Sequence, residues 1–501
     1  MSAKKSKPSR RGFFAASAIG ATALSMTAKS YAEIKGANEA VRIGFLGVGG
    51  RCQQHIDVIL KMQAEKKLVK PVAANDVWDG DQTKGKGKGQ GLYPAAKRMG
   101  IEDDKKHVSK DYRTILDQKD VDMVVIASPD HWHAKMTIDA LGAGKHVYCE
   151  KPMTRTIAEA HAVVDAWKKT SLTMTVGVQS MADPTWRLAN EYIKAGNIGH
   201  VMQGQTSYYR NSNIGQWRYY GLTKEMTPKT VDWKMFLGTE FGLAPDQPFD
   251  RAKYAQWRCY WDFGGGMYTD LFVHQLTHMI QAMGVRFPRR VVGAGGLYLE
   301  YDGRDVPDVA TVVADYDEGC QVLISATMAN DVQLGEVIRG HTGTISFGGN
   351  PKDGFSVAAQ KIDGRPAPPG ANTAGGGERF NPEQPADDTR ALWNHYIECV
   401  RSRNQETLCT AETGYAAIAT VNLGVKSYRE GHAYYFDKAT GNVSVADESW
   451  AKKWEKISRE RGKPNQVMGW HSGTEGSLLQ APDYQKLEGD WVGGKDPAEK
   501  A

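Results

Sequence analysis

The chain has 501 residues, of which 41% are apolar and 24% are charged, and its formal net charge is +5. It is too long for one ordinary domain and has enough apolar residues for two packed cores, so we expect two domains. Residues 1–32 contain six Lys or Arg and no acidic residue, and subtracting these six charges from +5 leaves −1 for the remainder. This balance argues against binding to nucleic acid or to an anionic membrane.

The N-terminus has the features of an export signal. Arg10 and Arg11 precede a weakly apolar run over residues 15–28, and the small residues within 30–32 suit a processing site. This pattern resembles a twin-arginine signal peptide, so we expect residues 1–32 to be removed. Because the twin-arginine route carries folded proteins, we expect a mature protein of the periplasm or cell envelope. No other segment approaches the roughly 20 apolar residues of a membrane span, so we expect no membrane insertion of the mature form.

The first predicted strand leads into a glycine-rich turn. Residues 41–46 are apolar, and residues 47–60 follow as a turn and a helix with apolar residues on one face. This order of strand, tight turn and helix is typical of a dinucleotide-binding site. Gly47 permits the turn, and Gly49 lets the backbone approach a pyrophosphate.

Gly50 and Arg51 begin the predicted helix, where free backbone amides form an anion site. Cys52 stands where the third glycine of the motif usually stands, a departure that weakens the motif. A second apolar strand ends in Asp76, which we expect to accept hydrogen bonds from ribose hydroxyls. Because a carboxylate there would repel a 2′-phosphate, NAD is favoured over NADP, although three lysines within residues 84–88 leave NADP possible.

Strands and helices then alternate. The predicted helices lie near residues 93–99, from 112, at 134–142 and at 157–168, and the predicted strands lie near 108 and at 121–127, 146–149 and 172–178. Such alternation is the signature of a doubly wound parallel sheet. We therefore predict an α/β Rossmann domain over residues 33–180.

Longer β-rich runs follow beyond residue 200. They lie at residues 201–209, 291–301, 309–316, 321–328 and 342–347. Polar turns between them, such as residues 315–319, predict a large, mostly antiparallel sheet. We therefore predict an α+β substrate and oligomerisation domain over residues 181–462, with helices near 388–428 that pack back on the Rossmann domain. Residues 463–501 are expected to form a C-terminal arm.

The six cysteines show no Cys-x-x-Cys spacing. A protein that folds before export matures in a reducing cytoplasm, where disulfides are rare. We therefore expect most of these cysteines to be core residues.

Three polar clusters carry the chemistry, and the first is Glu150-Lys151-Pro152 at the end of a predicted strand. Ligands of open α/β sheets bind at this end. A partly desolvated lysine beside an oxidised nicotinamide ring loses stability in its charged form and can exchange a proton with a hydroxyl. A surface lysine at the end of a strand is the alternative interpretation of Lys151.

The second cluster follows three glycines and places Asp270, His274 and His278 one turn apart on one face of a predicted helix. Two histidines and an acid in this spacing can also ligate a metal such as zinc, but the sequence contains no further ligand motif, so we predict no metal site. His278 is alternatively a hydrogen-bonded core histidine.

The third cluster runs from Ser128 and Pro129 to His133, at the end of the fourth predicted strand. In an alternative interpretation, Ser128 or Asp130 caps a helix that begins at Ala134.

Aromatic rings alternate with arginine at residues 208–210, 217–220 and 257–261. Such surfaces suit the apolar faces and hydroxyl edges of sugars. A hydrophobic core or a subunit interface explains any one of these segments equally well.

Together the clusters resemble the glucose-fructose oxidoreductase and inositol dehydrogenase family, Gfo/Idh/MocA, over roughly residues 41–437. The resemblance implies that Lys151, Asp270 and His274 are catalytic. Asp270 would bind and orient the substrate, and His274 would transfer a proton at the hydroxyl that is oxidised. The resemblance also implies a homo-oligomer.

The same resemblance implies a cofactor-side loop with Ser128, Pro129 and His133 near the nicotinamide ribose, and places Glu150 and Lys151 beside the cofactor. Since the cell envelope is not expected to supply free nicotinamide cofactor, we expect NAD(P) to stay bound and to be recycled internally. The function so implied is oxidation of a sugar or cyclic polyol hydroxyl. The alternatives are a redox-assisted glycosidase or lyase and a catalytically silent nucleotide-binding protein.

Overall fold

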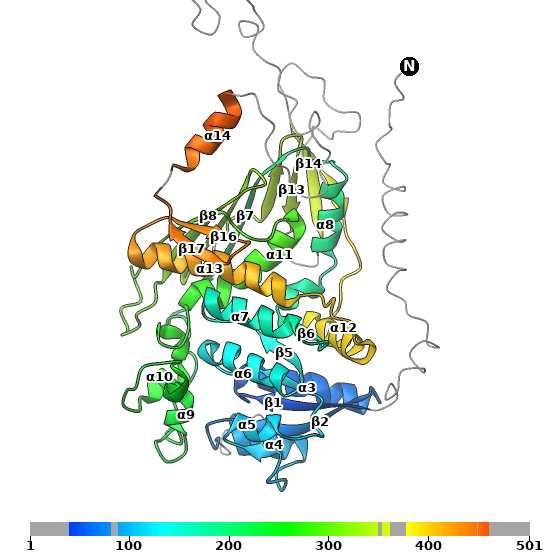
Figure 1. The fold of residues 1–501 in the computed structure, drawn as a ribbon, viewed down its shortest axis with the longest axis vertical. Coiled ribbons are helices and arrows are strands. Elements are labelled where there is room, and N and C mark those ends of the chain that lie inside the picture. Colours follow the sequence, from blue (N-terminus) through cyan, green and yellow to red (C-terminus); the bar gives the residue numbers. More distant parts are fainter. Residues whose placement is uncertain (1–39, 82–88, 349–352, 361–376, 448, 460–501) are drawn as a thin grey trace, which may run out of the picture.

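The computed structural model describes residues 40–81, 89–348, 353–360, 377–447 and 449–459. The predicted signal peptide (1–32), the three lysines of residues 84–88 and the C-terminal arm (463–501) lie outside the described residues. The two predicted sheets lie at opposite ends of the molecule, with the first at the blue end of the ribbon in Figure 1.

The first sheet has six parallel strands in the order β3-β2-β1-β4-β5-β6. They are β1 (Val41–Leu46), β2 (Val69–Asn75), β3 (Val108–Ser109), β4 (Met123–Ile126), β5 (His146–Glu150) and β6 (Met174–Gly177). The strand order reverses between β1 and β4, and ligands of doubly wound sheets bind at such a reversal. The predicted Rossmann sheet is therefore confirmed.

The helices of this half are α3 (Gly50–Ala64), α4 (Leu92–Met99), α5 (Tyr112–Leu116), α6 (Asp130–Gly142) and α7 (Ile157–Lys168). The prediction that a helix begins at Ala134 was wrong, because α6 begins four residues earlier. Pro129 precedes its first turn with a φ of −61°, which suits a helix start. The N-terminus of α6 has no side-chain cap, so neither Ser128 nor Asp130 caps this helix.

The second sheet has eleven strands, with β11 paired to β7 beside the main path β15-β14-β13-β12-β7-β10-β9-β8-β16-β17. They are β7 (Val201–Asn211), β8 (Arg290–Gly296), β9 (Val309–Tyr316), β10 (Cys320–Thr327), β11 (Ala329–Asn330), β12 (Val337–Gly340), β13 (Gly343–Phe347), β14 (Phe355–Ala359), β15 (Glu378–Phe380), β16 (Tyr434–Asp437) and β17 (Asn442–Val445). Apart from the parallel pair β7 and β10, its neighbours are antiparallel. The predicted α+β class is confirmed.

One predicted strand is shorter than expected. The apolar run at residues 291–301 continues as strand only to Gly296, which pairs with Val309. The fully buried carboxylate of Asp308 then accepts hydrogen bonds from the amides of Tyr298 and Leu299 at 2.9 and 2.7 Å. These bonds curl the chain away from the sheet into a loop.

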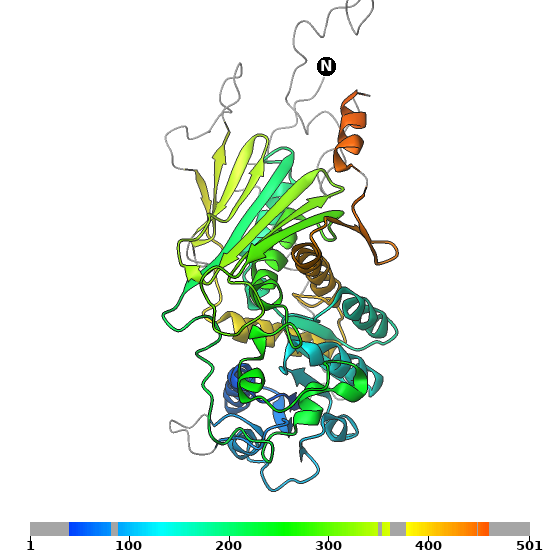
Figure 2. The same cartoon turned by 90° about the vertical axis from the view of Figure 1, so that its left-hand side faces the viewer.

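Helices cover one face of the large sheet (Figure 2). They include α8 (Thr185–Lys194), α11 (Val273–Met283) and α13 (Ala411–Glu430), while α14 (Trp450–Arg459) lies at the end of the molecule farthest from the Rossmann sheet (Figure 1). A short π-helix, η4 (Tyr268–Phe272), leads directly into α11. None of the described helices is long and apolar enough to cross a bilayer.

Helix α12 (Asp388–Ser402) packs on the Rossmann domain although it follows the large sheet in sequence. Its Trp393 stacks on Tyr148 of β5, with ring centroids 4.6 Å apart and planes 5° from parallel. The C-terminal part of the chain therefore supplies side chains to the core behind β5.

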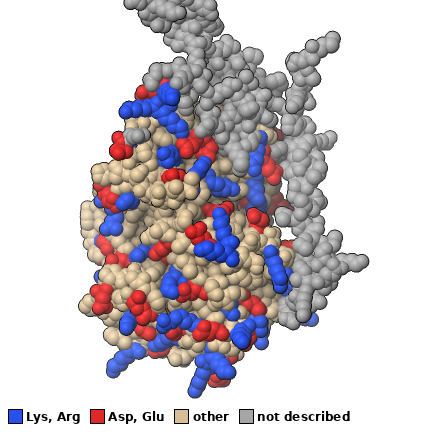
Figure 3. All heavy atoms as spheres, viewed as in Figure 1, with Lys and Arg blue, Asp and Glu red and all other residues tan. Residues whose placement is uncertain are grey.

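All six cysteines are buried and free, which confirms that they are core residues. On the face seen in Figure 3, acidic and basic side chains are interspersed, and no extended basic area is visible.

A segment between β7 and η4, residues 212–267, runs beside the Rossmann domain, and we name it the strap. It contains α9 (Trp233–Leu237) and α10 (Arg251–Ala255), which lie beside the Rossmann helices in Figure 1. The amide of Asp232 donates to the carbonyl of Val77 at 2.7 Å, so the strap is hydrogen-bonded to the loop that follows β2.

Candidate active site

A cavity of about 330 Å³ lies between the strap and the carboxyl ends of β1, β2 and β4, and we name it the cofactor cleft. Its lining includes the predicted residues Gly47, Gly49, Gly50, Arg51, Asp76, Ser128 and Pro129. On the opposite side, the strap contributes Tyr219, Tyr254, Trp257 and Arg258. The cleft is therefore formed by both parts of the chain. Tyr219, Trp257 and Arg258 belong to the aromatic and arginine segments that the sequence suggested for sugar binding, and their place in the wall of this cleft was not expected.

The two glycines of the first turn differ in what surrounds them. Gly47 has a φ of +80°, and a Cβ there would lie 2.6 Å from the backbone nitrogen of Ser128, so a side chain does not fit. A Cβ on Gly49 would have no neighbour within 4 Å. Gly49 thus faces open space directly before the N-terminus of α3, where a phosphate can approach the amides.

Asp76 follows β2 and lines the cofactor cleft. Its carboxylate accepts a hydrogen bond from the amide of Trp78 at 2.9 Å and also interacts with the hydroxyl of Tyr254. Burial raises the pKa of Asp76 to about 6 despite these hydrogen bonds. The carboxylate of Asp76 therefore lines the cleft, beside the turn that contains Gly47 and Gly49.

A second cavity of about 260 Å³ adjoins the first, and we name it the reaction pocket. Residues that line both cavities are Gly50, Arg51, Ala127, Ser128, Tyr219, Tyr220 and Arg258. Lys151, Asp270 and His274 meet in its wall. The three residues with predicted catalytic roles, which come from two distant parts of the sequence, are therefore brought together.

The carboxylate of Asp270, in the wall of the reaction pocket, accepts hydrogen bonds from three side chains. Lys151 donates from Nζ to Oδ1 of Asp270 at 2.6 Å, and Arg258 donates to the same oxygen at 3.0 Å. The indole of Trp217 donates to Oδ2 at 2.9 Å. Burial by itself raises the pKa of this carboxyl, but the charges of Lys151 and Arg258 hold the pKa of Asp270 well below its usual range. Asp270 is thus ionised, and its oxygens orient Lys151.

His274 lies next to this ion pair and makes no hydrogen bond to any residue that the structure describes. Its ring is 6.2 Å from the ring of Tyr208, measured between centroids. Desolvation, assisted by the charge of Lys151, lowers the pKa of His274 to about 3. The imidazole is therefore neutral near pH 7 and has a nitrogen free to accept a proton.

Glu150 is buried at the end of β5 and lines the reaction pocket, whereas the sequence predicted it beside the cofactor. Its Oε1 accepts hydrogen bonds from Arg51 and His55, both at 2.8 Å, and its Oε2 accepts one from the amide of Lys151 at 3.1 Å. Burial opposes ionisation, but Arg51 and His55 hold the pKa of Glu150 well below its usual range. The carboxylate fixes the backbone from which Lys151 projects.

His133 lines the reaction pocket and is a buried cation. Its Nδ1 lies 2.6 Å from the carbonyl oxygen of Pro152, and its Nε2 lies 2.9 Å from that of Ser128. Because carbonyl oxygens only accept hydrogen bonds, both ring nitrogens must donate, and the ring must be doubly protonated. Burial lowers the pKa of His133, but the nearby groups Cys149 and Asp130 outweigh it and raise the pKa to about 9.

His278 does not reach the reaction pocket. Its ring stacks on Trp186 with centroids 3.9 Å apart, and its nitrogens lie 3.1 Å from Ser180 Oγ and 2.7 Å from Glu336 Oε1. It is therefore a hydrogen-bonded core histidine, one turn beyond the pocket. Among the described residues, no group of three or more His, Cys, Asp or Glu is arranged to hold a metal ion.

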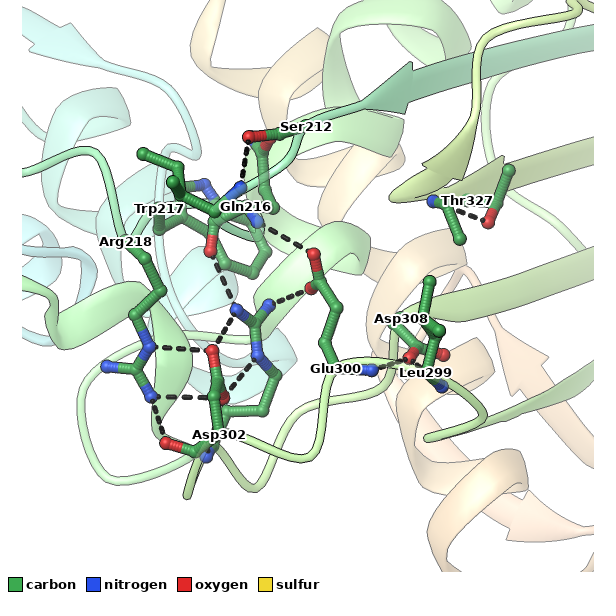
Figure 4. A network of polar contacts seen from close by, with 12 residues as sticks. Ser212, Gln216, Trp217, Arg218, Leu299, Glu300, Asp302, Asp308 and Thr327 are labelled. Carbon is green, nitrogen blue, oxygen red and sulfur yellow. Dashed lines mark hydrogen bonds and ion pairs between the residues drawn. The ribbon is translucent and has the colours of Figure 1, made fainter.

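An ion pair and a hydrogen bond fasten the strap to the loop between β8 and β9 (Figure 4). Arg218 of the strap donates to Asp302 of the loop at 2.7 Å. The buried Arg304, also in the loop, donates to the same carboxylate at 2.6 Å and to the strap carbonyl of Gln216 at 2.9 Å. This network holds the neighbouring Trp217, whose indole donates to Asp270. The loop thus supports the geometry of the reaction pocket.

Several residues that support this site were not predicted from the sequence. His55 lies four residues after Arg51 on α3, and this helical spacing was a usable signal. No local pattern points to Trp393 or Tyr254, because only the fold brings them to the site.

Comparisons with known proteins agree with this architecture. Residues 41–178 match the family described as "Oxidoreductase family, NAD-binding Rossmann fold". Residues 190–436 match the family described as "Oxidoreductase family, C-terminal alpha/beta domain". Lys151, Asp270 and His274 all fall within these two ranges.

Levoglucosan dehydrogenase from Pseudarthrobacter phenanthrenivorans is 33% identical over 159 residues, which are 29% of this chain and 40% of that protein. Alpha-N-acetylgalactosaminidase from Shewanella oneidensis is 26% identical over 198 residues, which are 37% of this chain and 40% of that protein. The chain therefore spans 40% of the length of these relatives. Aldose-aldose oxidoreductase from Caulobacter crescentus shares the fold, with a TM-score of 0.54, 21% identity and coverage of 79% of this chain and 100% of that one.

Proposed function

Because this chain belongs to the Gfo/Idh/MocA family of NAD(P)-dependent oxidoreductases, we propose that it oxidises a hydroxyl of a sugar or cyclic polyol. The observation that carries the proposal is the meeting of Lys151, Asp270 and His274 in a pocket that adjoins the cofactor cleft. Oxidation of a hydroxyl requires a proton acceptor at oxygen beside a hydride acceptor at carbon, and the two cavities offer these places.

The cofactor cleft fits a dinucleotide. The space before α3 at Gly49 suits the pyrophosphate, and Asp76 suits the ribose hydroxyls. The carboxylate of Asp76 would repel a 2′-phosphate, which favours NAD over NADP. Bound NAD would supply the hydride acceptor.

His274 and Lys151 act on the oxygen of the reacting hydroxyl. The neutral imidazole of His274 accepts the proton of the reacting hydroxyl. Lys151, held by Asp270, donates a hydrogen bond to the same oxygen while His274 removes its proton. Arg258 and the indole of Trp217 hold the carboxylate of Asp270, which keeps this ammonium in place.

The strap supports retention of the cofactor between turnovers. The indole of Trp132 and the ring of His131 both hydrogen-bond the carbonyl oxygen of Phe236 at 2.8 Å, so the strap is attached to the Rossmann domain on this side of the cleft. Departure of a dinucleotide would require some of these contacts to break. We therefore expect the hydride to return to a second carbonyl compound or to a later intermediate of the same substrate, with the cofactor still bound.

Redox-assisted cleavage of a glycoside is the second candidate function. It is favoured by the 26% identity to alpha-N-acetylgalactosaminidase over 198 residues. Oxidation at a ring carbon would acidify the neighbouring C–H, and a base such as His274 would remove that proton as the glycosidic substituent leaves. The reaction pocket suits either reaction.

Export in the folded state is part of the proposal. The pair Arg10 and Arg11 supports twin-arginine export to the periplasm or cell envelope, with the cofactor acquired before export. Replacing both by Lys should retain the precursor in the cytoplasm, as measured by cell fractionation. Export of this variant at the normal level would contradict the assignment.

We also propose a homo-oligomer formed through the large sheet. The face that carries no described helix presents the adjoining half-buried residues Val292, Val313 and Leu323. Light scattering of the purified protein should give a mass above that of one chain, and Val313→Asp should lower it.

The proposed function is tested on the purified mature protein. Its absorbance in the reduced-nicotinamide band should rise with a sugar or polyol and fall again when a carbonyl compound is added, and denaturation should release NAD. Cleavage of a glycoside without net reduction would favour the second candidate. Protein that purifies without any nicotinamide would contradict cofactor retention.

A further inference from the structure

The reaction pocket contains a guanidinium that forms no ion pair with a described carboxylate, although the charge of Asp270 acts on it from beyond contact distance. Arg210, near the end of β7, lines the pocket together with Lys151 and Arg258. Lys151 and Arg258 share the carboxylate of Asp270 at 2.6 and 3.0 Å. Arg210, by contrast, forms no ion pair with any residue in the described part of the chain. Because buried charges in proteins are normally paired, the unpaired guanidinium of Arg210 suggests that an anionic group binds there.

Tyr208 holds this guanidinium in place. The Arg210 side chain lies over the Tyr208 ring, with Cζ 4.7 Å from the centroid, and donates from Nη2 to the Tyr208 hydroxyl. A guanidinium has five N–H groups in a planar fork, and this contact uses one of them. The ring of Tyr208 also lies beside His274, the predicted proton acceptor, at 6.2 Å between centroids. Arg210 and His274 thus flank one aromatic ring in the same pocket.

The net charge of the reaction pocket is also positive. Its cationic groups are Arg51, Lys151, Arg210, Arg258 and the doubly protonated His133, and its carboxylates are Asp130, Glu150 and Asp270. A neutral sugar offers only hydroxyl groups, which leave this surplus positive charge uncompensated. An anionic ligand would neutralise it.

We propose that the substrate is an acidic sugar, whose carboxylate or sulfate group binds Arg210 while the reacting hydroxyl lies at His274. This inference rests on the proposed function, because it assigns the substrate class of the same pocket. The planar fork of Arg210 matches two oxygens of a carboxylate or sulfate and forms charge-assisted hydrogen bonds with them. The anion thereby fixes which hydroxyl of the ring reaches His274.

The test uses sets of three methyl glycosides in the gluco and galacto series: the neutral hexoside, the hexuronide and the 6-sulfate. Two quantities are measured with the holoenzyme, kcat/KM for each compound and the binding constant by calorimetry. The variants are Arg210→Gln, which removes the charge, and Arg210→Lys, which keeps it without the fork. Arg390→Gln is the matched control, because Arg390 pairs with Glu65 outside both cavities.

We expect the charged member of at least one set to be preferred over the neutral member by about 10- to 100-fold, the range of a charge-assisted hydrogen bond. Arg210→Gln should bring this ratio close to one, Arg210→Lys should keep part of it, and Arg390→Gln should keep all of it. Preference for the hexuronide identifies a carboxylate, and preference for the 6-sulfate identifies a sulfate. Either preference, if lost in Arg210→Gln, supports the proposal.

The absence of a preference in every set, or a preference that survives in Arg210→Gln, would overturn the inference. Calorimetry separates this failure from failure of the proposed function. If a hexuronide binds through Arg210 but no compound reduces the cofactor or is cleaved, the proposed function is wrong and the inference stands. If neutral glycosides react as well as charged ones, the proposed function stands and the inference is wrong.

Discussion

The indole of Trp393 donates a hydrogen bond of 2.9 Å to Nδ1 of His55, which precedes it by 338 residues. Because an indole N–H only donates, Nδ1 must be unprotonated, and the remaining proton lies on Nε2, which donates to Glu150 at 2.8 Å. Burial keeps this histidine neutral by lowering its pKa. Helix α12 thus determines which nitrogen of His55 faces the carboxylate beside Lys151.

We expect Trp393→Phe to lower the free energy of unfolding by about 1–3 kcal/mol, because it leaves a buried acceptor without a donor. Phenylalanine preserves the ring that stacks on Tyr148. Trp186→Phe is the matched control, because the buried Trp186 N–H has no hydrogen-bond partner among the described residues. Denaturant unfolding measures both variants, and an equal loss in the two would contradict the role of this hydrogen bond.

Alanine substitutions at Gly47 and Gly49 separate the effect on folding from the effect on cofactor binding. Gly47→Ala should destabilise the fold, because a Cβ there would lie 2.6 Å from the backbone of Ser128 at a φ of +80°. Gly49→Ala should leave stability nearly unchanged, because no protein atom lies within 4 Å of its Cβ. It should nevertheless weaken NAD binding, since the methyl group enters the space assigned to the pyrophosphate.

Thermal denaturation and calorimetric titration of the apoprotein with NAD measure the two effects. Unchanged NAD affinity in a folded Gly49→Ala protein would place the pyrophosphate elsewhere.

The sequence predicted the parts of this site that local patterns encode. A strand followed by a glycine turn and a helix is a local pattern, and it gave the positions of Gly47 and Asp76. The end of a parallel strand is also recognisable locally, but it was the resemblance of the motifs to a known family that assigned a catalytic role to Lys151. The helical spacing of Asp270 and His274 suffices to put both on one face, and the fold brings that face to Lys151.

The sequence was less informative where distant segments meet. His278 has the same spacing as His274, but α8 supplies Trp186 to cover it one turn farther along. The strap contains only short helices, so no long periodic pattern showed that it closes the cofactor cleft. Trp393 reaches His55 only because α12 folds back onto the Rossmann domain.

Lys151→Met should leave the cofactor bound and lower turnover by about 10²- to 10⁴-fold, the range of general acid-base catalysis. The variant should remain folded, because Asp270 keeps its hydrogen bonds from Arg258 and Trp217. Lys135→Met is the control, since Lys135 pairs with Asp139 on α6 outside the pocket. Retained turnover with bound cofactor would refute the assignment of Lys151.

Protonation of His274 should not slow the oxidation step as the pH falls through 6.5. The pKa of His274 is lowered to about 3, so the neutral, proton-accepting form persists as the pH falls from 8 to about 4. The rate of cofactor reduction in a single turnover of the holoenzyme measures this dependence. An acid limb between pH 6 and 7 that is absent in His274→Asn would show that His274 titrates normally and would contradict its neutral, desolvated state.

His133 should make stability fall in the alkaline range. Its pKa rises from 6.5 in the unfolded chain to about 9 in the folded protein, so the native state binds the proton more tightly. The resulting stabilisation, about 3 kcal/mol, is fully present below pH 6.5 and is lost as the pH rises through about 9. At high pH the neutral ring can donate to only one of the carbonyl oxygens of Pro152 and Ser128.

Denaturant unfolding at pH 6.5 and at pH 9.5 measures this contribution of His133. The wild type should lose stability between the two values, and His133→Gln, which cannot bind the proton, should lose about 3 kcal/mol less. His432→Gln is the control, because His432 is exposed and should leave the difference unchanged. If His133→Gln loses as much stability as the wild type, the ring is not the cation that its two carbonyl partners require.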